Sequence, residues 1–216
     1  MKTRYLMAPM VLALTLTATP SQAVLINFDD FDASAVPAVD SLNPYQGFTW
    51  QNWFGFTTPT GGFFANGIVS GPNAAFSGFQ FFGGAPVPAT ISNGSPFSLT
   101  SAYLGAGWLD GLSITVQGFL GATQVATQDL ILGVSGAALT NFIGFGNVDQ
   151  VVFLTSGVGT SDPLGCGNFN CGQFTVDNIS FGPPVVARVP EPATLALLSL
   201  GFAALGINGV RRKRVV

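Results

Sequence analysis

Residues 112–117 read LSITVQ and alternate strictly between apolar and polar side chains. Successive side chains of a β-strand point to opposite faces, so this stretch predicts a strand with one buried face in an antiparallel sheet. Gly121-Ala122-Thr123 then provides a turn, and the chain returns through residues 124–132. We therefore expect the two segments to form a β-hairpin.

Similar short segments recur along the chain between residues 24 and 188, separated by Gly, Pro, Asn and Asp. The candidate strands are residues 24–28, 48–54, 89–92, 97–106, 112–120, 124–132, 142–145, 150–155 and 174–181. No helical periodicity competes with them. Short strands at regular intervals favour an all-β fold, either a sandwich or a barrel, and we expect an antiparallel two-sheet sandwich.

The first 23 residues have the features of a secretory signal peptide. Lys2 and Arg4 precede an apolar run over residues 6–16, and Ser21-Gln22-Ala23 places small residues where a signal peptidase reads them. We expect export, with cleavage after Ala23. The alternative is an uncleaved membrane anchor.

Residues 189–216 combine three features in a fixed order. Val189-Pro190-Glu191-Pro192 precedes an uncharged run, residues 193–210, and then Arg211-Arg212-Lys213-Arg214. As a helix the uncharged run would be about 27 Å long, close to the roughly 30 Å of a bilayer's hydrocarbon core. Cations directly after it favour the cytoplasmic side, which leaves the body of the chain outside the cytoplasm. The two prolines predict an extended, accessible peptide beside the membrane.

This order resembles the PEP-CTERM sorting signal, which membrane transpeptidase-like exosortases recognise in Gram-negative bacteria that make exopolysaccharide. The resemblance is confined to residues 189–216. It implies processing at Pro190, Glu191 and Pro192, with residues 211–214 as the basic stop. It also implies that the protein is held transiently in the inner membrane and then reaches the cell surface or a biofilm matrix. The alternative is an ordinary tail anchor.

Without its two ends the chain leaves residues 24–188, a length suited to one domain. Six of the seven basic residues lie in the two ends, so only Arg188 remains as a cation. A surface so poor in cations cannot neutralise phosphates, which disfavours nucleic-acid binding. No charged residue occurs between Asp40 and Asp110. The neutral polar side chains of that interval can hydrogen-bond to neutral polymers.

Two short segments at the ends of this domain resemble jelly-roll domains of the galactose-binding-like, carbohydrate-binding-module type. They are FDDF at residues 28–31 and VDNISF at residues 176–181, where the alternation slips at Asp177-Asn178 and predicts a β-bulge. The resemblance implies adjacent first and last strands with a structural calcium ion near them. Asp29, Asp30 and Asp177 would then be its ligands. The alternative is that these aspartates only cap turns and strand ends.

Catalytic side chains are scarce. Histidine is absent, and residues 24–188 contain no lysine. The familiar Ser/His/Asp and Cys/His constellations cannot be built, and zinc sites lack their usual ligands. We therefore predict no catalytic residue and no enzyme activity. Two aspartates could in principle hydrolyse a glycosidic bond, and Asp110 and Asp149, each in a turn beside a predicted strand, are the pair to test.

Cys166 and Cys171 are the only cysteines and share a loop rich in Gly and Asn. A close pair in an exported loop most simply forms a disulfide. The loop that this bond closes is small, so the expected stabilisation is modest, on the order of 2 kcal/mol.

The candidate ligand-binding side chains are aromatic: Trp50, Trp53, Tyr103 and Trp108. Their rings can stack against the apolar faces of sugars. Trp50 and Trp53 are three residues apart, so in a regular strand they would point to opposite faces, with one of them in the core.

Three functions stay open at this stage. The favoured one is a non-catalytic cell-surface or matrix protein that interacts with exopolysaccharide. The second is a structural or adhesive protein that binds other proteins. The third is a glycan-active enzyme.

Overall fold

The computed structural model describes residues 23–31, 42–57, 63–78, 87–155, 159–163 and 171–185. The predicted signal peptide before Ala23 and all of residues 189–216 lie outside this part of the chain. Within it, no helix is long and apolar enough to cross a membrane. The spanning helix at residues 193–210 therefore stays a prediction.

The described residues form strands and one short 3-10 helix. The strands are β1 (Val24–Ile26), β2 (Thr49–Gln51), β3 (Trp53–Thr57), β4 (Asn73–Ser77), β5 (Ala89–Ala106), β6 (Leu112–Leu120), β7 (Thr123–Leu132), β8 (Ala138–Asn141), β9 (Val148–Thr155) and β10 (Phe174–Gly182), and the 3-10 helix is η2 (Phe64–Gly67). Every strand pairing is antiparallel. The predicted all-β, antiparallel class is confirmed.

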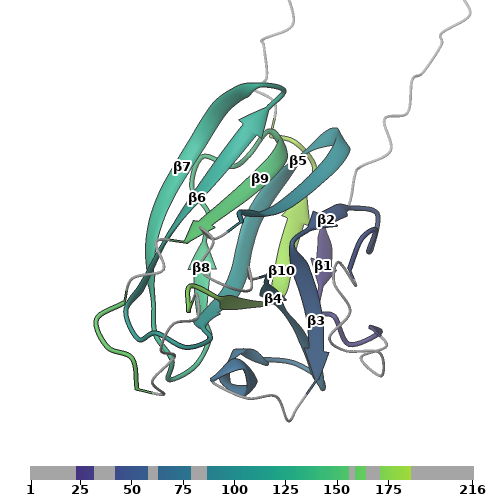
Figure 1. The fold of residues 1–216 in the computed structure, drawn as a ribbon. Coiled ribbons are helices and arrows are strands. Elements are labelled where there is room, and N and C mark those ends of the chain that lie inside the picture. Colours follow the sequence, from purple (N-terminus) through teal and green to yellow (C-terminus); the bar gives the residue numbers. More distant parts are fainter. Residues whose placement is uncertain are drawn as a thin grey trace, which may run out of the picture.

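The strands lie in two layers that share β5 (Figure 1). The first half of β5 pairs with β2 and β9, and the second half pairs with β10 and β8. The register shifts between Ser92 and Phe97, and residues 94–96 are exposed there. The sequence predicted two strands, residues 89–92 and 97–106, whereas one long strand passes from layer to layer.

The hydrophobic core lies between the layers. On β6, Leu112, Ile114 and Val116 are at most 1% exposed, so the alternation that predicted this strand does reflect one buried face. Across the core, Phe153 of β9 meets Phe174 of β10 at 5.7 Å between ring centroids. Each fully buried side chain of this size stabilises the fold by about 1.5–3 kcal/mol relative to an exposed position.

Trp50 and Trp53 are both completely buried, which corrects their assignment as ligand-binding residues. The predicted strand at residues 48–54 is interrupted at Asn52, whose φ of 61° lies in the left-handed region. Because β2 and β3 then belong to different layers, the period of two does not carry across Asn52. Both indoles therefore point into the core, where they donate hydrogen bonds to Tyr45 O (3.0 Å) and Thr90 O (3.1 Å).

The strand assignment fails at three further places: residues 142–145, β4, and β8, which the sequence did not predict. Residues 142–145 are not a strand, although Phe142 N donates to Thr100 O and Phe145 O accepts from Leu99 N, so this segment continues along β5. Strand β4, which the sequence did not predict, is buried at every position. A strand covered on both faces has no alternation to reveal it.

The first and last strands are neighbours, as the resemblance to jelly-roll domains implied. Strand β1 pairs with β10, where Ile26 lies opposite Ile179. The register of β10 against β5 shifts between Asp177 and Ser180, and Asn178 has a φ of 48°. The predicted bulge is confirmed, and it places Asp177 beside the end of β1.

Candidate functional site

Asp177 is fully buried at the β10 bulge. Its Oδ2 accepts hydrogen bonds from the backbone N–H groups of Val69 (2.7 Å) and Ser70 (2.9 Å), and its Oδ1 accepts one from Asn178 (2.7 Å). Burial raises the pKa of this carboxyl, while the three N–H donors act in the opposite direction. The nearby charge of Asp29 adds a smaller upward contribution.

Asp29 lies against Gly71, in the same loop as the Val69 and Ser70 N–H groups that bind Asp177. Asn27 Nδ2 donates to its Oδ2 at 2.6 Å, whereas its Oδ1 is buried and has no hydrogen-bond partner in the part of the chain that the structure describes. A Cβ on Gly71 would collide with this carboxylate, so the loop approaches it as closely as glycine allows. An unsatisfied buried acceptor costs about 1–3 kcal/mol, which makes Oδ1 the exceptional atom of this site.

Asp30 is hydrogen-bonded to a different part of the chain from the other two acids. Its carboxylate accepts hydrogen bonds from the Tyr45 hydroxyl and from Gln46 Nε2, the latter at 2.7 Å. Burial, together with the Asp30 carboxylate, raises the pKa of Tyr45. No group of three or more acidic, His or Cys side chains suited to a metal occurs among the described residues. The three aspartates therefore do not form the single cluster that the resemblance implied.

Asp110 and Asp149 cannot act together on one bond. Asp110 Oδ1 accepts from Val134 N (3.1 Å) just before β6 begins, and Asp149 Oδ2 accepts from Gly121 N (2.8 Å) just after β6 ends. A strand of this length separates its ends by roughly 30 Å. Glycosidase carboxyls must lie within about 10 Å of each other. Both aspartates instead fix turns.

The other two predicted ligand-binding aromatics, Tyr103 and Trp108, are partly exposed. Trp108 Nε1 donates to Gln173 Oε1 at 2.6 Å, and its ring packs 5.6 Å from that of Phe64. Tyr103 lies on β5, opposite Asp177 on one side and Leu139 on the other. A ligand-binding role for these two side chains stays a prediction.

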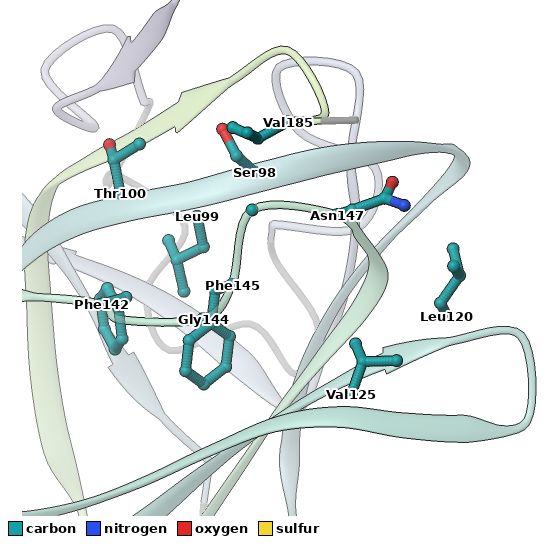
Figure 2. A pocket seen from close by; sticks show the side chains of 11 residues that line it. Ser98, Leu99, Thr100, Leu120, Val125, Phe142, Gly144, Phe145, Asn147 and Val185 are labelled. Carbon is teal, nitrogen blue, oxygen red and sulfur yellow. The ribbon is translucent and has the colours of Figure 1, made fainter. Parts of the chain in front are cut away.

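An open cleft of about 580 Å³ lies where the tip of the β6–β7 hairpin faces the turn between β8 and β9 (Figure 2). Its lining residues are Ser98, Leu99, Thr100, Leu120, Val125, Phe142, Gly144, Phe145, Gly146, Asn147 and Val185. None of them is charged. Val125 is the extra residue of a bulge, because Gly118 pairs with Ala126 and Phe119 pairs with Gln124.

Sequence reasoning missed this cleft because its lining comes from separated segments that only the folded chain brings together. None of the four predicted aromatic ligand residues lines it. The one local signal is the uncharged turn at residues 142–147, which contains two glycines, but its residues 142–145 fit a strand equally well.

The predicted disulfide involves a residue outside the described part of the chain, Cys166. Cys171 is described and is buried. The bond between them stays a prediction.

Residues 188–213 match the family model of the PEP-CTERM protein-sorting motif. The expected sorting signal is thereby confirmed, and it marks an exosortase-sorted surface protein that passes through the membrane. No curated protein sequence matches the chain significantly.

Several solved structures are similar in fold. A DUF4465 family protein from Bacteroides caccae has a TM-score of 0.43 and 12% identity, over 63% of this chain and 73% of that chain. The K2 cleaved adhesin domain of Lys-gingipain has a TM-score of 0.41 and 14% identity, over 74% and 98%. CBM32-3 from a family 31 glycoside hydrolase of Clostridium perfringens has a TM-score of 0.34 and 15% identity, over 61% and 91%. These are distant likenesses.

Proposed function

We propose that this chain is a non-catalytic surface or matrix protein whose jelly-roll-like domain, residues 24–188, binds neutral exopolysaccharide in the cleft of Figure 2. The sorting motif supports delivery to the cell surface. The uncharged lining of the cleft is the observation that carries the choice of ligand.

A neutral polysaccharide suits this lining chemically. Apolar side chains such as Leu120 and Val125 can pack against the apolar face of a sugar ring, while hydroxyl and amide groups can exchange hydrogen bonds with its hydroxyls. Asn147 has no side-chain hydrogen bond to any residue that the structure describes, so its amide is available. An acidic or basic ligand would meet no opposite charge in the cleft.

We expect Asn147→Ala to weaken binding to neutral polysaccharides by roughly tenfold, because it removes hydrogen bonds to the ligand without touching the core. The measurement is a glycan array that carries neutral and acidic polysaccharides, followed by titration of the best neutral ligand. Asn141→Ala is the matched control, since Asn141 is an exposed asparagine outside the cleft. Equal binding by both variants, or a preference for acidic glycans, would show that the cleft is not the site.

The sorting motif also predicts how the protein is released. We expect residues 193–210 to hold the exported protein transiently in the inner membrane of a Gram-negative bacterium, until an exosortase cuts near Pro190-Glu191-Pro192. Intact-mass analysis of the surface protein should then show a chain without residues 211–214 and without the residues before Val24. A mature species that keeps the Arg-rich end would identify the tail as a plain anchor.

We further propose a structural calcium ion held by Asp29 and Asp177. The buried, unpartnered Oδ1 of Asp29 and the absence of a Cβ at Gly71 support this assignment. Carboxylate and backbone carbonyl oxygens are the ligands that Ca²⁺ prefers. Bound there, the ion would neutralise the negative charges of these two acids. It would also link the segment that follows β1 to the bulge of β10.

A further inference from the structure

Strand β7 is the outermost strand of its layer (Figure 1). It pairs with β6 on one side, and no described strand lies on the other. It contains a single charged residue, Asp129, and neither proline nor lysine nor arginine. Free edges of natural sheets usually carry prolines, lysines, other charges or bulges that hinder pairing with another chain. Beyond the bulge at Val125, Asp129 is the only such feature of β7.

The part of β7 suited to pairing begins after the bulge at Val125. From Ala126 to Leu132 the register against β6 is regular. The side chains of Thr127, Asp129 and Ile131 are exposed on the outer face, with Ile131 at 71%.

The opposite face of this segment is anchored to the domain. Gln128 donates from Nε2 to Asn141 O (3.1 Å), and its Oε1 accepts from Ile143 N (3.2 Å). A held edge loses little conformational freedom on pairing, which favours association.

We propose that β7 pairs antiparallel with β7 of a second copy of this chain, about a two-fold axis at Gln128. In this register Thr127 lies opposite Asp129 of the second copy, and Ala126 lies opposite Leu130. The arrangement is isologous, so each of these pairs occurs twice. The layer that contains β7 in one copy then joins the same layer of the second copy into one continuous sheet.

Charge selects this register, and hydrogen-bond complementarity favours a second copy as the partner. An axis at Asp129 would place the two carboxylates opposite each other, which is unfavourable. An axis at Leu130 would place each Asp129 against an Ile131. Of these three axes, only the one at Gln128 places a neutral hydroxyl donor, Thr127, opposite each carboxylate. The same kind of contact exists within the chain, where Thr115 Oγ1 donates a hydrogen bond to Asp129 Oδ1 at 2.6 Å. The strand therefore carries both a hydroxyl donor, Thr127, and a carboxylate acceptor, Asp129, at positions that face each other about this axis.

Variants of Thr127 test the proposal on the exported protein purified from the cell surface. Thr127→Asp creates two like-charge pairs in the dimer, and Thr127→Lys creates two opposite-charge pairs. Sedimentation equilibrium should show a dimer whose Kd rises in the first variant and falls in the second, with roughly tenfold or more between the two variants. Gln117→Asp is the matched control, because Gln117 pairs with Thr127 from β6, one strand away from the edge.

Cysteine cross-linking tests the register. A chain with Thr127→Cys and Asp129→Cys should oxidise to a covalent dimer. A chain with Thr115→Cys and Gln117→Cys, the residues of β6 that pair with Asp129 and Thr127, should not. A wild-type protein that stays monomeric at all concentrations would overturn the proposal. A dimer unaffected by charge at residue 127 would assign the interface elsewhere.

Discussion

Replacing Trp53 with alanine will lower the free energy of unfolding by about 3–5 kcal/mol, the usual cost of truncating a buried aromatic side chain. Trp53 is 0% exposed, and its ring lies 5.4 Å from Phe153 and 5.6 Å from Phe174, one from each layer. The substitution also leaves Thr90 O without its indole donor. Because domains are stable by only about 5–15 kcal/mol, this is a large fraction of the total.

Thermal unfolding of the exported protein measures the effect, and the melting temperature should fall by roughly 10 °C or more. Trp53→Phe keeps most of the packing and should lose much less. Ile143→Ala, at a position that is 81% exposed, should change stability by at most about 0.5 kcal/mol. If Trp53→Ala instead left stability unchanged and abolished glycan binding, Trp53 would be a ligand platform and the burial described above would be wrong.

Calcium is expected to have the second large effect. Binding to the folded state alone stabilises by RT ln(1 + [L]/Kd), so calcium at about a hundred times its Kd should add roughly 2.7 kcal/mol. For a domain of this length the melting temperature should rise by about 5–10 °C. The measurement compares chelator-treated protein with and without millimolar calcium.

The structure separates the three aspartates in this experiment. Asp177→Asn and Asp29→Asn should each abolish the calcium-dependent rise, because the first residue is buried at the bulge and the second carries the unpartnered oxygen. Asp30→Asn should retain it, since Asp30 is hydrogen-bonded to Tyr45 and Gln46. No rise in the wild-type protein would mean that the aspartates only cap a turn and a bulge. Loss of the rise in Asp30→Asn would restore the cluster of three.

Local patterns were reliable wherever one face of a strand is buried. Strand β6 begins and ends at the residues that the alternation predicted, and the slip at Asp177-Asn178 is the observed bulge. The same reasoning failed at Trp50 and Trp53, because one left-handed residue between them moves the chain from one layer to the other. It could not detect β4, whose two faces are both covered.

The sequence by itself determined the all-β class, the hairpin of β6 and β7, the sorting signal and the presence of a single basic residue, Arg188, between its two ends. These properties belong to consecutive residues or to composition, so no long-range contact is needed to read them. Only the tertiary structure decided that Asp29 and Asp177 share a loop while Asp30 does not, and that four distant segments line an uncharged cleft. Such groupings depend on which strands become neighbours, and that follows from packing of the whole core rather than from any single stretch of chain.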